Sequence, residues 1–203
     1  MSSLAFFARH SEELAIFKGV QGDAAVKLPP TFVSIWSHDG RRLANVQDAG
    51  VLVCDIEADP GDMKVRVMDG SSSLCRNMAW SEKSTWLLAH RPADKDKEKA
   101  AAEDNHLMVW DPSTGSLKLS MRHPRVQRAS WPVLKWTSDE AMVVYSTADG
   151  HVQLFDGALS STTPLATLPV AHVTCLEWAP MVGGLYRLAV FSAEGHNDDL
   201  SVS

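Results

Sequence analysis

The chain alternates between short apolar runs and polar turns, and one such phrase recurs four times. Each copy is an alternating apolar stretch that ends in a tryptophan, followed by a small residue and then a turn. The four tryptophans are Trp36, Trp80, Trp136 and Trp178. After the first three, a second, a third and a weaker fourth apolar run follow. Short strands separated by turn signals such as Asp39-Gly40 and Asp149-Gly150 indicate an all-β fold.

The spacing of the four tryptophans gives the period of the repeat. Successive spacings are 44, 56 and 42 residues, and the long one contains residues 92–105, of which 8 of 14 are charged. Without about a dozen of these residues, the period matches the 40–45 residues of a four-stranded WD-type blade. Since one four-stranded sheet cannot bury both of its faces, stacked blades must cover one another.

The repeat therefore predicts a partial, WD-repeat-like β-propeller with about three full four-stranded blades plus pieces of others. We expect residues 1–203 to belong to a single propeller domain, with 92–105 as a charged loop insert that is either a solvated loop or a docking element. The four tryptophans are expected at blade-to-blade contacts, because a large flat ring suits that interface. An opening hairpin is expected over residues 4–17, and after Trp178 one good strand over 186–191. Three blades and part of a fourth would leave the ring open, so we expect a fragment of a longer protein.

Composition and charge narrow the functional classes. Apolar residues make up 45% of the chain and charged residues 22%, which is typical of a globular protein. The net charge is −6, so any nucleic-acid contact needs a local basic patch, a partner or chain outside this sequence. The three cysteines form no CxxC pair, which argues against a zinc site and a disulfide framework and favours the cytoplasm. No apolar run approaches the roughly 18–20 residues of a membrane helix, so no membrane partner is expected.

Motifs for catalysis are missing from the sequence, and the basic residues are its remaining chemical feature. We find no GxSxG, GxxxxGK[ST] or HExxH motif and no GxGxxG after a strand, so we expect neither an enzyme nor a cofactor. Arg122, Arg125 and Arg128 could hold phosphates, although an ordinary exposed loop is the alternative. Arg41 and Arg42 are weaker candidates of the same kind.

Several of these phrases resemble one family. The runs 107–115 and 131–140, the run 179–191 and the opening 6–14 are similar to the amino-terminal propeller of the eukaryotic translation initiation factor 2A family. The b subunit of eukaryotic translation initiation factor 3 has a related propeller with a similar Trp-Pro and Lys-Trp phrase, here Trp131-Pro132 and Lys135-Trp136. The resemblance covers most of the chain and is strongest over 105–192.

The resemblance implies a translation initiation factor that binds the small ribosomal subunit and supports delivery of initiator tRNA. It implies other initiation factors as partners, and contacts to tRNA and mRNA through a carboxy-terminal part outside this sequence. No RNA-binding residue carries over, because no matched motif defines one. The alternative from the residues alone is a general WD-repeat scaffold for protein interactions.

Overall fold

The computed structural model describes residues 33–56, 64–92, 106–122, 131–147, 149–170 and 172–192 with their side chains. It also describes the backbone of four further strands near the two ends of the chain. The described part contains eighteen β-strands in five antiparallel sheets and no helix. None of its elements is a helix that could cross a lipid bilayer.

We call the five sheets blades 1 to 5 in chain order; within each, neighbouring strands follow one another along the chain. Blade 1 holds β1 (Ser3–Phe6), β2 (Leu14–Lys18) and β3 (Ala24–Leu28). Blade 2 holds β4 (Ser34–Trp36), β5 (Arg42–Gln47), β6 (Gly50–Asp55) and β7 (Lys64–Val67). Blade 3 holds β8 (Arg76–Trp80), β9 (Leu87–Arg91), β10 (His106–Trp110) and β11 (Leu117–Arg122). Blade 4 holds β12 (Leu134–Trp136), β13 (Met142–Ser146), β14 (His151–Asp156) and β15 (Ala166–Pro169). Blade 5 holds β16 (Val173–Trp178), β17 (Tyr186–Ser192) and β18 (Asn197–Val202).

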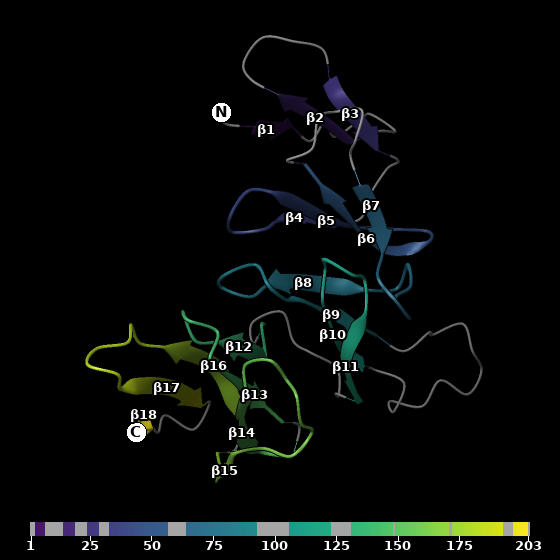
Figure 1. The fold of residues 1–203 in the computed structure, drawn as a ribbon. Coiled ribbons are helices and arrows are strands. Elements are labelled where there is room, and N and C mark those ends of the chain that lie inside the picture. Colours follow the sequence, from purple (N-terminus) through teal and green to yellow (C-terminus); the bar gives the residue numbers. More distant parts are fainter. Residues whose placement is uncertain are drawn as a thin grey trace, which may run out of the picture.

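The sheets follow one another in an open arc, with β1–β3 and β16–β18 at its two ends (Figure 1). The predicted partial propeller with three full four-stranded blades is therefore confirmed. The sequence pattern missed two strands, β3 and β18, which pair along their length with β2 and β17. Such outer strands are held by main-chain hydrogen bonds to one neighbour, so they need no strong apolar alternation. Residues 93–105 of the charged insert lie outside the described residues.

Apolar cores fill the spaces between blades 2 and 3, 3 and 4, and 4 and 5. One core joins blades 2 and 3 around Trp110, which has no exposed surface. A second joins blades 3 and 4 around Trp136, and a third joins blades 4 and 5 around Leu176. The middle strands supply most of these residues because both of their faces are covered. The outer strands β7, β11 and β15 are largely exposed.

Two of the four repeat tryptophans make the same hydrogen bond to the preceding blade. The indole Nε1 of Trp80 donates to the carbonyl oxygen of Ile35 at 3.4 Å, and that of Trp178 donates to Lys135 at 3.1 Å. Each acceptor precedes the repeat tryptophan of the blade before, so the contact follows the repeat. These two rings therefore lie at contacts between neighbouring blades. Trp136 departs from the pattern: it lies in the core between blades 3 and 4, but its Nε1 donates within its own blade, to Gly157 at 2.9 Å.

A hydroxyl residue directly after the tryptophan organises the turn in blades 2, 3 and 4. The hydroxyl oxygens of Ser37, Ser81 and Thr137 each accept the backbone N–H of the residue five positions later, at 2.9–3.1 Å. Three residues after each hydroxyl residue, the backbone adopts a positive φ, between 58° and 69°. We call the end of the blades that carries these turns the turn end, and the opposite end the far end.

Side chains on these turns join neighbouring blades at the turn end. Ser84 Oγ of blade 3 accepts the backbone N–H of His38 in blade 2 at 2.9 Å. Glu140 of blade 4 accepts the backbone N–H of Lys83 in blade 3 at 2.6 Å. Tyr186 of blade 5 donates its hydroxyl to Asp139 in blade 4 at 2.6 Å. Hydrogen bonds at these turns thus join each of these blades to the next, in addition to those that close the turns themselves.

The three cysteines are all free thiols. Cys54 and Cys75 are buried, whereas Cys175 is exposed on blade 5. Burial raises the pKa of the Cys54 thiol to about 11, so it stays protonated at neutral pH.

Candidate nucleic-acid interface

The structure separates the two groups of arginines that the sequence suggested. Arg41 and Arg42 lie at the turn end of blade 2, before and at the start of β5. Arg41 is exposed, while Arg42 is half-buried and its Nη1 donates to the carbonyl oxygen of Ser84 at 3.4 Å. Arg42 therefore contributes to the joint between blades 2 and 3, which leaves Arg41 as the more accessible of the pair.

Arg122 lies at the far end of blade 3, as the last residue of the outer strand β11. Its side chain is exposed. The strand register places it there, because Arg122 pairs with His106, the first residue of β10, and that strand runs back to the turn end. Arg125 and Arg128 fall in residues 123–130, outside the described residues.

Three basic side chains share one cross-strand row at this far end. Arg91 ends β9, His106 begins β10 and Arg122 ends β11, and the register pairs Arg91 with His106 and His106 with Arg122. Side chains directly opposite each other on neighbouring antiparallel strands lie on the same face, with Cβ atoms about 4.5–5.5 Å apart. We call Arg91, His106 and Arg122 the basic row.

The surroundings of the basic row add positive charge at the same end of the blade. Arg76 begins β8 there and donates its Nη1 to the carbonyl oxygens of Ser73 and Cys75, at 2.7 Å in both cases. Burial raises the pKa of the Cys75 thiol, and the nearby charges of Arg91 and Arg76 partly oppose this shift. Four basic residues therefore gather at the far end of one sheet, although the chain as a whole is acidic.

A polar contact to strand β11 holds His106, the middle residue of the basic row. The Nδ1 atom of His106 lies 3.1 Å from the hydroxyl oxygen of Ser120, two residues before Arg122 on β11. Arg91 and His106 are half-buried, whereas Arg122 is exposed. Two guanidinium groups beside an imidazole match phosphate oxygens, because planar guanidinium forks donate two parallel hydrogen bonds.

A cavity of 410 Å³ between β11 and blade 4 has Arg122 of the basic row in its lining. Its lining combines apolar side chains such as Phe155 and Leu159 with polar ones, including Arg122, Asp149 and the buried Tyr145. Asp149 is engaged within its own turn by the hydroxyl of Thr147. The cavity gives the far end an apolar recess directly beside exposed positive charge.

The sequence suggested Arg122 but missed Arg91 and His106. These two residues flank the charged insert, so their proximity follows only from the pairing of β9 with β10. The available signal was that Arg91 comes shortly after one predicted strand and His106 directly before the next. Among the repeat tryptophans, Trp80 and Trp136 are buried in the cores between blades, Trp178 is half-buried against the core of blades 4 and 5, and Trp36 is half-buried.

Comparison with known proteins gives structural matches but no sequence match. No family model matches the chain, and neither does any curated protein. The fold is similar to a solved structure described as the crystal structure of the eukaryotic initiation factor, with a TM-score of 0.70 and 19% sequence identity. The match covers 99% of this chain and 48% of that one, so this chain spans about half the length of that structure. Structural matches extend to 764 chains, which is what a widely used architecture produces.

Proposed function

We propose that this chain is the docking body of a translation initiation factor and that it binds the small ribosomal subunit through RNA phosphates held by the basic row. The observation that carries the proposal is the fold similarity to an initiation factor over 99% of the chain. Fold alone does not determine function, so the basic row is needed as the physical reason for RNA contact. In this role the propeller would support delivery of initiator tRNA in the cytoplasm, together with other initiation factors and without catalysis or a cofactor.

The charge distribution is consistent with docking at one place. Phosphate contacts supply most of the affinity of proteins for nucleic acid, and arginine is the residue best suited to them. Because the net charge is −6, the rest of the surface disfavours non-specific RNA binding. Positive charge gathered at the far end of blade 3 would then orient the propeller on the subunit.

Co-sedimentation of the full chain with purified small ribosomal subunits, over a series of salt concentrations, tests the proposal. We expect binding that weakens as salt rises, because bound counterions are released from RNA. Arg122→Glu should reduce binding and lower the slope of log affinity against log salt by about 1. Arg41→Glu is the matched control: it makes the same charge change on an exposed arginine at the turn end, and it should leave binding nearly unchanged.

Two results would contradict the proposal. Absence of co-migration at every salt concentration would remove the ribosomal role. Equal losses for the two variants would show that overall charge, rather than the basic row, determines binding.

A general protein-interaction scaffold is the second candidate. It is favoured by the acidic net charge and by a cavity along the first strands of blades 2, 3 and 4, where protein ligands could bind without any RNA. Propeller blades serve many unrelated binding functions. This candidate predicts protein partners and no association with ribosomal subunits, so the same co-sedimentation experiment separates the two.

A further inference from the structure

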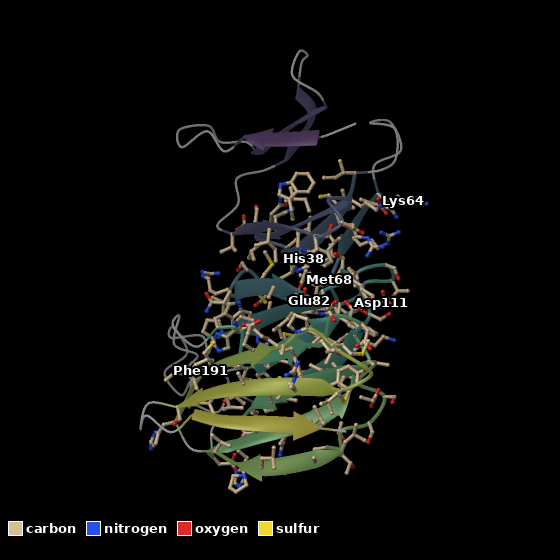
Figure 2. The ribbon with its side chains drawn as sticks, turned by 90° about the vertical axis from the view of Figure 1, so that its left-hand side faces the viewer. His38, Lys64, Met68, Glu82, Asp111 and Phe191 are labelled. Carbon is tan, nitrogen blue, oxygen red and sulfur yellow. The ribbon has the colours of Figure 1, made fainter. Side chains whose placement is uncertain are left out.

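A cavity of 320 Å³ opens along the first strands of blades 2, 3 and 4. Its lining includes the repeat tryptophans Trp36, Trp80 and Trp136, and its polar members include His38, Glu82 and Lys135. His38 and Glu82 lie on neighbouring turns at the turn end (Figure 2). The cavity thus lies along the first strands and reaches the turn end, whereas the basic row lies at the far end of β9, β10 and β11.

The cavity forms where the repeated contact between blades is interrupted. Trp80 and Trp178 each donate their indole N–H to the first strand of the preceding blade. Trp136 instead donates to Gly157 of its own blade, so no indole hydrogen bond joins β12 to β8. Strand β8 also carries a bulge between Arg76 and Ala79, with Asn77 at a φ of 51°. Bulges of this kind re-aim the side chains beside them, and Ala79 lines the cavity.

One charge at the cavity is left without a partner. Lys135 forms an ion pair with Glu177. Glu82, in contrast, is exposed and makes no hydrogen bond or ion pair within the described residues. An uncompensated carboxylate therefore stands beside a recess whose walls are largely apolar and aromatic.

We propose that this cavity receives an arginine side chain from a protein partner. Its volume is at the lower end of the range for small-molecule sites, which suits one long side chain. The aliphatic part of an arginine can lie along the apolar wall while its guanidinium group stacks on an indole ring and pairs with Glu82. Arginine suits this better than lysine, since a guanidinium group is planar, weakly hydrated and able to bind a carboxylate through two hydrogen bonds.

The proposal does not depend on the ribosomal function. The cavity involves the turn end, whereas RNA contact was assigned to the far end. A protein carrying a basic segment would fit either an initiation factor or a general scaffold. Reversal of Arg122 should therefore leave binding at the cavity unchanged.

Indole N–H signals of the full chain, labelled with ¹⁵N in tryptophan, provide the test. The probe is the peptide acetyl-Gly-Gly-Arg-Gly-Gly-amide, and the control peptide carries citrulline, a neutral isostere, in place of arginine. We expect saturable shifts of Trp36, Trp80 or Trp136 with the arginine peptide, at least about fivefold weaker binding with citrulline, and a fixed signal for the buried Trp110.

Glu82→Gln should weaken binding of the arginine peptide by about three- to fivefold, the effect of one exposed ion pair. Asp48→Asn is the matched control, because Asp48 is an exposed carboxylate in the turn between β5 and β6, at the far end. Both variants should keep the unfolding midpoint of the unmodified chain. Three results would overturn the proposal: no saturable shift, equal binding of the citrulline peptide, or the same loss in both variants.

Discussion

Replacing Trp136 with alanine is the most direct test of how the blades are held together. The Trp136 side chain is only 4% exposed, and it is part of the core between blades 3 and 4. Burial of a tryptophan removes about 150–250 Å² from water, worth at most about 4–6 kcal/mol at about 25 cal/mol per Å². The indole hydrogen bond to Gly157 adds about 1 kcal/mol. Because alanine retains a methyl group and the surroundings relax only in part, we expect Trp136→Ala to lower the free energy of unfolding by about 3–5 kcal/mol.

Urea unfolding of the full chain measures this loss, provided that the slope of free energy against urea is unchanged. Trp36→Ala is the comparison, because Trp36 is half-buried and its indole N–H makes no hydrogen bond within the described residues. We expect it to cost less than Trp136→Ala, because Trp36 is more exposed and loses no hydrogen bond. Trp136→Phe keeps part of the apolar contact but removes one ring and the donor to Gly157, so its expected cost is about 1–3 kcal/mol. A loss below about 1.5 kcal/mol for Trp136→Ala, or equal losses at the two tryptophans, would refute this account of the core.

Three further predictions follow from single contacts. Gly157→Ala should destabilise the chain strongly in thermal unfolding, because an added Cβ would lie 1.7 Å from the carbonyl oxygen of Glu140; an unchanged melting temperature would contradict the close approach. Hydrogen bonds from Tyr186 and Thr137 lower the pKa of Asp139 to about 2, so this carboxylate stabilises the fold above about pH 4 and the contribution is lost as pH falls towards 2. Tyr186→Phe should therefore reduce the loss of stability between pH 4 and pH 2, and an identical acid profile would argue against the contact. With a thiol reagent at pH 8, one thiol should react rapidly in the native chain and the two buried ones only after unfolding; Cys175→Ser should abolish the fast phase.

The fold was largely predictable because its determinants are local. Blades 2 to 5 each repeat a tryptophan phrase and a period-two alternation, and both are visible in a single sequence. The strands that escaped prediction, β3 and β18, are outer strands held by pairing with one neighbour. Their positions depend on where a partner strand runs, which no local pattern specifies.

The candidate interface was predictable only in part, because it depends on register. Arg122 stood out within a run of arginines. His106 is separated from it by β10 and most of β11, and the charged insert separates Arg91 from His106. From the sequence, Arg41 and Arg122 are candidates of the same kind for binding phosphate. The structure places them at opposite ends of the blades. Such differences arise because the antiparallel arrangement decides which end of a sheet each strand terminus reaches.

The turns show why the repeat is degenerate in sequence although it is regular in structure. The position with positive φ is glycine in blade 2, where Gly40 marks a turn, but Ser84 and Glu140 occupy it in the next two blades. A left-handed backbone costs a non-glycine residue about 1–2 kcal/mol, and one hydrogen bond returns about 1 kcal/mol. These two side chains each accept a backbone N–H from the preceding blade, which glycine could not do. The cost of the left-handed backbone and the gain from the hydrogen bond nearly cancel in the free energy of unfolding. Replacing glycine by serine or glutamate therefore mainly affects the position of one blade relative to the next. A sequence motif that is defined within one blade is therefore less regular at positions where a side chain joins two blades.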